Sequence, residues 1–575
     1  MQLEKIELVG KKVFPIGLPS GIVATDPRCA KRLMDMCEEY GIWTGKSTSP
    51  YAKIVPEGDE VENPNPDIEY SCREPILAKL GPYRFLNAVG LTNPGAKVMR
   101  EMIQKAGIPE DRVKIGSIFG KTLDDYIEAA VILEDIVDLL EGNYSCPNSE
   151  KEGMVFGQDP KTVYKFTKTI VDAVDIPFLA KLTPNMDNVP FCIGDIAKAA
   201  IDAGAYGIVL INTAGPNKNP YLYFGRGGES GAGISDLRIK CLKEVRKAIG
   251  PVPFIQSMGG IFSPKDAEKD FENGADAIAI GTALAGMRDN EIAGFLKSFV
   301  YDLRNKTDTA SSYLKDVDMD YKPVKITEVI NRQSDFKIFK TDTSIDALPG
   351  QFVFAMLPDI GDNNKPGEKP FSIMDDNPLT LGVLERGYFT SHFNKLREGD
   401  TFYYKGPHGQ GIEIQIDKES KIFLIEGGCG LAGLYLPAKK FSEKGIDVTS
   451  FLGAKDKQHL PYLEEFEKLG CLEIATEDGS LGTKGTVADL IKGCVFNPDF
   501  NYYFFNCGPK AMVDAVLPLE LKVTSPDRVY SSIDYMTRCG VGLCGSCADP
   551  KGRRTCVEGP FINQTTTTPT SPISS

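Results

Sequence analysis

PFLAKL, at residues 177–182, is an apolar run of strand length, and three more such runs follow it: YGIVLIN (206–212), VPFIQSM (252–258) and DAIAIG (276–281). The segments between apolar runs have helical periodicity, as from Thr122 to Leu140 and from Asp159 to Val174. Apolar strands separated by amphipathic helices predict a parallel sheet that is buried on both faces. Over roughly 300 residues, a (β/α)8 TIM barrel is the economical closure, with its chemistry at the C-terminal strand ends.

Four cysteines near the C-terminus are spaced C-x4-C-x2-C-x8-C: Cys539, Cys544, Cys547 and Cys556. A C-x4-C-x2-C run followed by a more distant cysteine is the plant-type ferredoxin spacing, which holds a 2Fe-2S cluster. Three glycines within the run supply the positive φ angles and close backbone approach that such a loop needs. A structural zinc site usually has two C-x2-C pairs, and here only Cys544 and Cys547 form one. The spacing therefore favours the cluster over zinc.

Changes of pattern along the chain predict an α/β protein of several domains. A polar stretch follows the barrel, short alternating strands come next, and KIFLIEGGCGLAGLYLPAKKF (421–441) then has the strand, glycine turn and helix of a nucleotide-binding unit. The predicted divisions are a barrel over 1–304, a linker over 305–322, an antiparallel β-barrel over 323–415, a Rossmann-like domain over 416–525, a 2Fe-2S domain over 526–562 and a disordered tail over 563–575.

Composition excludes several classes of function. The net charge of -14 over 575 residues argues against a nucleic-acid partner. No uninterrupted apolar window is long enough to cross a bilayer, and the start MQLEKIELVGKK lacks the features of a signal peptide, so we expect a cytoplasmic protein. All 3 histidines lie in the second half, so proton transfer in the first half must use cysteine, lysine, tyrosine or a carboxylate.

Cys146, in the run NYSCPN, is the candidate base of the first half. Because proline follows it, this cysteine sits in a shaped loop and not in a helix. Taken alone, a buried loop cysteine is the commoner interpretation. Lys181, Asn212 and Asn87, however, lie at or near predicted strand ends, where a barrel assembles its site.

Two glycine turns follow late strands of the predicted barrel. They are Gly259-Gly260 after VPFIQSM and Gly281-Thr282 after DAIAIG. Backbone amides at such turns form the phosphate site expected after the seventh and eighth strands. Together the two turns predict that the barrel binds the phosphate of flavin mononucleotide (FMN).

Residues 1 to about 300 resemble dihydroorotate dehydrogenase of the cytosolic class, in the branch that uses NAD. The matching stretches are GIWTGKST (41–48), LNAVGLTNPG (86–95), NYSCPNS (143–149), FGQDP (156–160), AKLTPN (180–185), INTAG (211–215), SMGGI (257–261) and IGTAL (280–284). The resemblance implies an enzyme that oxidises dihydroorotate to orotate in de novo pyrimidine (UMP) biosynthesis. The segment 50–74, rich in Pro, Asn and acidic residues, departs from the family pattern. The resemblance therefore does not predict the form of a lid over the substrate.

The resemblance also implies roles for individual residues. Cys146 would take the proton from carbon 5 of dihydroorotate while a hydride leaves carbon 6 for FMN, and Lys181 would lie at the N1/O2 edge of the flavin. The implied substrate-binding residues are Lys46, Asn87, Val89, Gly90, Leu91, Asn143, Asn148, Asn212 and Thr213. The implied FMN-binding residues are Ser20, Gly21, Lys46, Ser47, Asn143, Lys181, Ile211, Gly231, Gly259, Gly260, Gly281 and Thr282.

Residues 323–562 resemble the iron-sulfur flavoprotein subunit that partners the NAD-linked enzymes, within the ferredoxin reductase superfamily. By this resemblance, FAD is bound by Lys369, Pro370, Phe371, Ser372, Gly387, Thr390 and Ser391. NAD is bound by Gly427, Gly428, Gly430, Cys507, Gly508 and Pro509. The sequence departs from the family at Lys369, where arginine is more usual, and at Cys429, where a glycine is usual.

The two resemblances together imply a path for electrons from dihydroorotate to FMN, the 2Fe-2S cluster, FAD and finally NAD, in a homodimer formed through the barrel. Two alternatives stay open. One is a dihydropyrimidine dehydrogenase-like enzyme acting on uracil or thymine. The other is an electron-carrier flavoprotein without dehydrogenase turnover, because a fold alone does not fix a function. The choice between NAD and NADP also stays open.

Overall fold

The computed structural model describes residues 3–53, 74–144, 156–187, 189–332, 335–360, 365–414, 416–460 and 463–565. Three of the sequence-based expectations therefore lie outside the described residues: the roles of Cys146 and Asn148, most of the segment 50–74, and most of the predicted tail. The chain divides into two compact units, one of Met1–Met319 with Arg538–Arg554 and one of Asp320–Thr537 with Thr555–Ser575. Each unit is described by itself.

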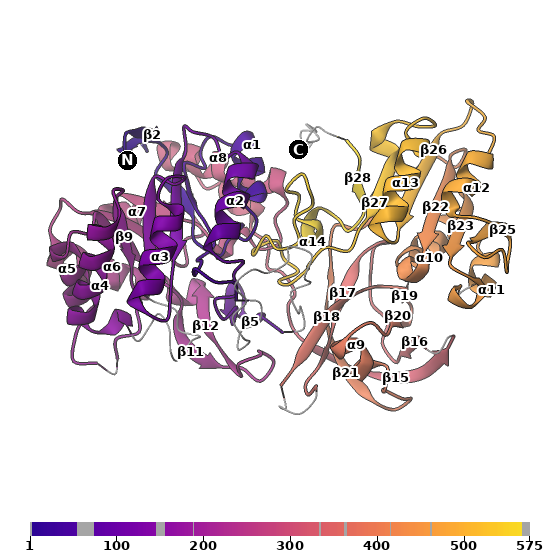
Figure 1. The fold of residues 1–575 in the computed structure, drawn as a ribbon, viewed down its shortest axis with the longest axis horizontal. Helices are drawn as coiled ribbons and strands as arrows, with labels where there is room; N and C mark the ends of the chain where they lie inside the picture. The colour runs from indigo at the N-terminus through magenta and orange to yellow at the C-terminus, as the bar shows by residue number, and fades with distance from the viewer. Residues whose placement is uncertain are drawn as a thin grey trace. The chain divides into compact units, whose positions relative to one another are not determined.

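The first unit is built on a closed barrel of eight parallel strands, which confirms the predicted TIM barrel (Figure 1). The four apolar runs named above form its strands β9, β10, β13 and β14. In chain order the barrel strands are β3 (Ile16–Leu18), β4 (Ile42–Thr44), β7 (Val113–Ile118), β8 (Leu139–Asn143), β9 (Phe178–Lys181), β10 (Gly207–Leu210), β13 (Phe254–Met258) and β14 (Ala277–Ala279). Around the barrel they follow one another as β10-β13-β14-β3-β4-β7-β8-β9.

Helices follow the barrel strands: α1 (Pro27–Met36), α2 (Ala96–Ala106), α3 (Leu123–Leu133), α4 (Pro160–Ala173), α5 (Ile193–Asp202), α6 (Ser235–Ile249), α7 (Pro264–Glu272) and α8 (Asp289–Asn305). A capping box of Thr122 and Asp125 opens α3, because each side chain accepts a backbone N–H of the other residue. The prediction that this helix reaches Leu140 was wrong. It ends at Leu133, since Leu139 and Leu140 begin the buried strand β8.

A four-stranded antiparallel sheet accompanies the barrel, in the order β11-β12-β6-β5. Its strands are β5 (Leu77–Gly81), β6 (Arg84–Asn87), β11 (Ala214–Lys218) and β12 (Arg226–Gly231). Asn87 therefore ends a strand of this sheet and not a strand of the barrel, which corrects the sequence-based placement. A separate hairpin of β1 (Ile6–Leu8) and β2 (Lys11–Val13) precedes the barrel.

The second unit begins with seven antiparallel strands: β15 (Lys322–Asn331), β16 (Phe336–Thr341), β17 (Phe352–Leu357), β18 (Gly367–Ser372), β19 (Asp375–Asp376), β20 (Leu379–Leu384) and β21 (Thr401–His408). Their order is β18-β17-β21-β15-β16-β20-β19, and the end strands β18 and β19 are not paired with each other among the described residues. The small barrel predicted from the sequence is thus an antiparallel sheet whose ends are not joined by strand pairing. A short helix, α9 (Tyr388–Phe393), follows β20.

The nucleotide-binding pattern forms a second seven-stranded sheet, in the order β25-β24-β23-β22-β26-β27-β28. Its strands are β22 (Lys421–Gly427), β23 (Asp447–Ala454), β24 (Cys471–Thr476), β25 (Thr483–Lys484), β26 (Tyr502–Cys507), β27 (Val529–Ser532) and β28 (Ile562–Asn563). All pairs are parallel except β27 with β28. The helices are α10 (Leu431–Glu443), α11 (Leu463–Glu467), α12 (Val487–Gly493) and α13 (Lys510–Glu520). No helix in the described ranges is long and apolar enough to span a membrane.

The cysteine-bearing segment Arg538–Arg554 belongs to the first unit, so the structure divides the predicted 2Fe-2S domain over 526–562. Backbone hydrogen bonds explain this placement: the N–H of Val23 donates to the carbonyl of Leu543 at 2.6 Å, and that of Gly286 donates to Val541 at 2.9 Å. The segment ends at Arg554, whose guanidinium is buried and pairs with Asp289 at 2.7 Å. Cys556 lies beyond this end, on α14 (Thr555–Glu558) of the second unit.

Candidate active site

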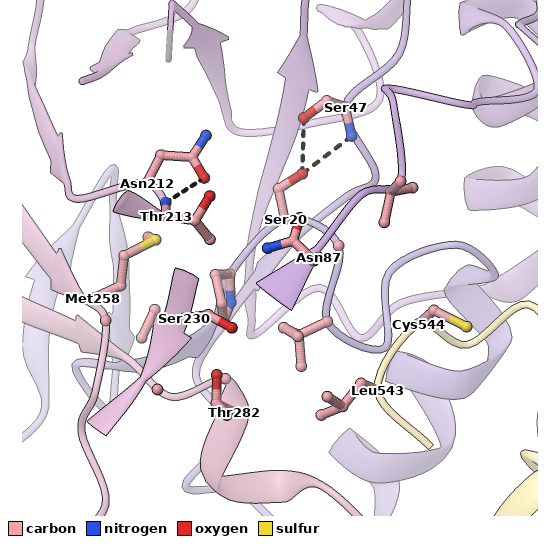
Figure 2. Close-up of a pocket in the computed structure, with 18 of the residues that line it drawn as sticks. Ser20, Ser47, Asn87, Asn212, Thr213, Ser230, Met258, Thr282, Leu543 and Cys544 are labelled. Atoms are coloured by element: carbon pink, nitrogen blue, oxygen red, sulfur yellow. Dashed lines mark hydrogen bonds between the residues drawn. The ribbon is translucent and has the colours of Figure 1, made fainter. Parts of the chain in front are cut away.

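A pocket in the first unit gathers the residues that the sequence singled out (Figure 2). Apart from Cys146 and Asn148, which lie outside the described residues, every expected substrate or FMN residue lines this one pocket. These are Ser20, Gly21, Lys46, Ser47, Asn87, Val89, Gly90, Leu91, Asn143, Lys181, Ile211, Asn212, Thr213, Gly231, Gly259, Gly260, Gly281 and Thr282. Most of them end a barrel strand or follow it, because parallel strands bring their C-terminal ends to one rim.

Lys181 is one of two buried lysines that line the pocket, the other being Lys46. Lys181 ends β9, beside Asn143 at the end of β8, and the two residues are paired in the barrel. The lysine is 3% exposed, and its Nζ lies 3.5 Å from Oε1 of Glu141, which is fully buried. A lysine with its charge offset by a carboxylate can remain at the wall of a buried pocket, where an unpaired ion would be costly. Sequence reasoning found Lys181 but missed Glu141, although a lone acidic residue within an apolar strand is a usable signal.

The loop at residues 89–91 has backbone that favours ligand binding. Gly90 and Leu91 both have positive φ, 66° and 59°. This conformation is costly for a leucine and is found where surrounding structure enforces it, often at ligand sites. Thr92 follows the loop, and its hydroxyl donates to the carbonyl of Val89 at 3.3 Å while it accepts from Nη1 of Arg538 at 2.8 Å. The loop is therefore held by a residue of the cysteine-bearing segment.

The glycine turns have the shape that a phosphate group needs. Gly259 and Gly260 have φ of 111° and 71°. A Cβ on Gly260 would lie 2.3 Å from Oγ of Ser235 and 2.6 Å from the carbonyl of Gly231, so only glycine fits. Ser235 is the first residue of α6, and the N-terminus of a helix favours an anion. This turn could therefore hold an anionic group of a ligand bound in the pocket.

Three residues of the cysteine-bearing segment also line the pocket: Cys539, Leu543 and Cys544. Figure 2 shows the last two. Sequence reasoning missed this part of the pocket wall, because nothing in a periodicity or a motif links residues so far apart along the chain. The structure thus puts two of the expected cluster ligands in the wall of the expected flavin site. A one-electron group held here would be next to a flavin in the pocket.

The cysteine loop has features that suit a 2Fe-2S cluster. Gly540, Gly542 and Gly545 have positive φ of 74°, 72° and 80°, as the spacing predicted. The N–H of Cys544 points to Sγ of Cys539 at 3.5 Å. Hydrogen bonding to Cys539, followed by burial and the nearness of Cys539 and Cys547, raises the pKa of the Cys544 thiol well above its usual value. A positively charged iron centre would offset this rise in pKa and favour the thiolate, which is the form of cysteine that ligates a cluster.

Within the described residues, no group of three or more His, Cys, Asp or Glu side chains is arranged as the ligands of a single metal ion. Cys539 and Cys547 are 3% and 1% exposed and lie in the first unit, whereas Cys556, 1% exposed, lies in the second. The assignment of all four cysteines to one cluster therefore rests on their spacing and on the loop around the first three.

In the second unit, the expected FAD and NAD motifs approach each other at α10. Ser372 ends β18 and Cys507 ends β26. A Cβ on Gly433, within α10, would lie 3.0 Å from Sγ of Cys507 and 3.3 Å from Oγ of Ser372. The missing side chain at Gly433 thus lets these two residues lie close to the same point of the helix.

The remaining expected FAD residues lie around β18 and α9. Lys369, Pro370 and Phe371 precede Ser372 in β18, and the ring of Phe371 packs on Phe393 at 5.7 Å between centroids. Gly387 caps α9, and Thr390 Oγ1 accepts its backbone N–H at 3.0 Å. Ser391 lies in the same helix.

The expected NAD residues form two turns that touch. Gly427 ends β22, and Gly428 has a positive φ of 56°. A Cβ on Gly430 would lie 2.0 Å from the carbonyl of Cys507, so the GGCG turn packs against the turn of Cys507, Gly508 and Pro509. Such close packing of a glycine turn between strand and helix is typical of nucleotide-binding folds.

Comparisons with known proteins relate this chain to two kinds of subunit. A family model described as dihydroorotate dehydrogenase matches residues 66–293. The probable dihydroorotate dehydrogenase B (NAD(+)) electron transfer subunit of Methanocaldococcus jannaschii is 35% identical over 244 residues, covering 42% of this chain and 90% of that protein. The catalytic subunit of dihydroorotate dehydrogenase B (NAD(+)) from Thermococcus kodakarensis is 36% identical over 217 residues, covering 37% of this chain and 69% of that protein. One chain is thus similar to both kinds of subunit.

A solved structure, the dihydroorotate dehydrogenase of Eimeria tenella in complex with ferulenol, is 18% identical with a TM-score of 0.42 and covers 54% of this chain and 88% of that one.

Proposed function

Because the chain belongs to the dihydroorotate dehydrogenase B (NAD(+)) family, we propose that it oxidises dihydroorotate to orotate, in pyrimidine biosynthesis, and passes the electrons to NAD. One observation carries the proposal. A single pocket is lined by the expected substrate and flavin residues and by Cys539 and Cys544 of the expected cluster. Such a pocket would join the oxidation of a substrate to the export of single electrons.

The protein residues of the first unit would bind and deprotonate the substrate. Cys146 is proposed as the base that takes the proton from carbon 5, since no histidine lies in this half of the chain. Lys46, Asn87 and the backbone amides of Val89 to Leu91 would hold the substrate carboxylate. The pyrimidine ring would be bound by Asn143, Asn148, Asn212 and Thr213, because the amide side chains of asparagine offer both donors and acceptors to its alternating N–H and C=O groups.

The cofactors proposed are FMN, a 2Fe-2S cluster, FAD and NAD. When bound, the flavins exchange electron pairs with substrate and nicotinamide, and the cluster carries electrons one at a time between them. FMN would be held in the pocket by Lys181 and the glycine turns, and the cluster by Cys539, Cys544, Cys547 and Cys556. FAD and NAD would be held by the motifs around β18 and α10. We also propose a homodimer formed through the barrel, which sedimentation of the purified protein would test.

The role of Cys146 is tested by its replacement with alanine. We expect Cys146→Ala to lower the turnover of dihydroorotate with NAD by about 10³-fold, since a positioned base contributes between 10² and 10⁴. Reduction of a dye by NADH should remain, because it needs only the second unit. The matched control is Cys192→Ala, which removes an exposed cysteine of the same unit.

We would measure the steady-state rates of both reactions on purified holoprotein with equal flavin and iron content. These rates distinguish a catalytic role of Cys146 from a structural one. Dihydroorotate oxidation that survives in Cys146→Ala would remove this cysteine as the base. Loss of both reactions together would mean that Cys146 only supports the structure.

A further inference from the structure

A line of hydrogen-bonded hydroxyl groups runs from the pocket wall to a buried carboxyl group. Ser20 Oγ lies 2.9 Å from Ser47 Oγ, and Ser47 Oγ lies 2.8 Å from Ser117 Oγ. Ser117 Oγ then donates to Oε1 of Glu141 at 2.7 Å. Ser20 and Ser47 line the pocket, and Figure 2 shows the dashed link between them, whereas Ser117 and Glu141 are 1% and 0% exposed. The line crosses from the ends of β3 and β4 to β7 and β8, which are neighbours in the barrel.

The hydroxyl protons in this line all point towards Glu141. An ionised carboxylate only accepts hydrogen bonds, so the hydroxyl of Ser117 must donate to it. Ser117 can then only accept from Ser47, and Ser47 can only accept from Ser20. Asn143 adds a further donor, because its Nδ2 lies 3.1 Å from Ser47 Oγ. The dipoles of these hydroxyl groups therefore stabilise a negative charge on the Glu141 carboxylate.

The same carboxylate oxygen is the ionic partner of Lys181. Oε1 of Glu141 lies 3.5 Å from Nζ of Lys181, and the two side chains are 0% and 4% exposed. This separation is longer than that of a strong charge-assisted hydrogen bond, about 2.7–2.9 Å. An ammonium group has three N–H donors, so one contact with Glu141 leaves others for the pocket that Lys181 lines. Oε2 of Glu141 has no hydrogen-bond partner among the described residues, so its charge is not taken up by other groups.

We propose that Glu141 is a positioning residue, which holds the ammonium group of Lys181 at the pocket wall and offsets part of its positive charge. The inference rests on the proposed function, in which Lys181 faces a bound flavin. An ammonium group beside a flavin stabilises the reduced, more negative form, because opposite charges attract strongly in a buried site. A carboxylate directly behind the ammonium weakens this effect. Glu141 would thus keep the pocket able to release electrons as well as to accept them.

The test is the midpoint potential of the pocket flavin in Glu141→Gln, measured by anaerobic spectroelectrochemistry on the full-length holoprotein without substrate. Glutamine has nearly the same shape, and its side-chain oxygen can still accept from Ser117 and Lys181, so the substitution removes only the charge. We expect the midpoint potential to shift to a more positive value. In steady state with dihydroorotate and NAD we expect kcat to fall while KM for dihydroorotate stays within about twofold, since Glu141 does not line the pocket.

Three further variants assign the effect. Lys181→Gln removes the positive charge and should shift the potential of the same flavin in the opposite direction, which also identifies that flavin among the redox groups. Glu141→Asp keeps the charge and should keep the wild-type potential. Glu291→Gln is the matched control, because Glu291 pairs with Lys315 at 2.7 Å in the same unit and neither residue lines the pocket.

An unchanged potential in Glu141→Gln at full flavin content, or a shift to a more negative value, would overturn the proposal. If Glu141→Gln does not retain flavin, the flavin content and midpoint potential of Glu141→Asp test the proposal instead. Retained flavin with a wild-type potential is expected there, and loss of flavin would show that the pocket needs the shape of the side chain and not its charge. The proposed function fails differently, since it would fail in the wild-type protein, as an absence of bound FMN or of reduction by dihydroorotate.

Discussion

Gly260 is the residue at which the expected phosphate cradle can be tested most simply. Its φ of 71° favours glycine, and an added Cβ would lie 2.3 Å from Oγ of Ser235. We expect Gly260→Ala to reduce the FMN content of the purified protein strongly, because the turn must move to admit the methyl group. The matched control is Gly250→Ala. Gly250 also has a positive φ, 77°, but a Cβ there meets nothing within 4 Å.

Both alanine variants carry backbone strain, roughly 1–3 kcal/mol, because both positions have a positive φ. The flavin-to-protein ratio after purification separates strain from steric exclusion. A loss of FMN in both variants to the same extent would mean that Gly260 has no special role at the flavin.

The residues of the pocket divide into those that the sequence could reveal and those that it could not. Lys181 and Asn143 end apolar runs, and barrel geometry then predicts that they meet. Asn87 was assigned to the right pocket but to the wrong sheet, since a strand end looks the same in the sequence whichever sheet it joins. Cys539 and Cys544 could not be placed at the pocket, because their position depends on contacts made between segments far apart in the chain.

At the scale of elements, the segment Arg538–Arg554 is fastened to the first unit by its last residue. The Arg554 guanidinium is fully buried, contacts the carboxylate of Asp289 and donates to the carbonyls of Met287 and Gly542. Loss of one partner from such a buried pair typically costs 3–5 kcal/mol. We therefore expect Arg554→Met to lose iron on purification, while FAD, which we propose is bound by the second unit, should remain.

The control for Arg554→Met is Arg246→Met. Arg246 also pairs with an aspartate, Asp276 at 2.8 Å, and donates to backbone carbonyls of the first unit, but it lies outside the cysteine-bearing segment. Iron per chain, measured by a colorimetric assay, should fall only in Arg554→Met. Equal iron loss in both variants would reduce the role of Arg554 to general stability.

Glu520, in α13, gives the nucleotide-binding sheet a dependence on pH. Burial raises the pKa of its carboxyl from 4.5 to about 7, although a hydrogen bond from Asn506 works against this. The folded protein therefore holds a proton that the unfolded chain has released, and stability falls as pH rises from about 4.5 to 7. Above this window the loss is complete.

Glu520→Gln should remove this dependence, because the amide stays neutral. We expect the variant to be more stable than wild type at pH 8, by on the order of 3 kcal/mol, and similar to it below pH 4.5. Urea unfolding at several pH values measures the difference, with exposed Glu464→Gln as the control. A constant gap between Glu520→Gln and wild type at all pH values would contradict the assigned cause.

Elements with strong periodicity were predicted well, and irregular ones were not. The barrel strands and α4 lie where their apolar patterns put them, because burial on both faces leaves a clear signal. The end of α3 was misplaced, since apolar residues of a helix and of the following strand form one run. The boundary of the cysteine-bearing segment was missed because its docking depends on Asp289 and on backbone groups, which leave no periodic trace.

At the scale of the whole molecule, one chain is similar to a catalytic subunit and to an electron transfer subunit. Its first unit holds the pocket that we propose binds substrate and flavin, and its second unit holds two glycine-containing motifs that lie close to α10. We propose that this single polypeptide carries out both half-reactions, which requires two flavins and one cluster for every chain.

The most direct test of this proposal is an anaerobic titration of the purified protein with dihydroorotate. Absorbance and electron paramagnetic resonance follow the reduction, and NAD is added at the end. We predict that dihydroorotate delivers roughly five electron equivalents per chain, two to each flavin and one to the cluster. NAD should then restore the oxidised spectra with the formation of NADH. Reduction that stops at one flavin, with no cluster signal and no NADH on addition of NAD, would show that this chain does not carry electrons from dihydroorotate to NAD.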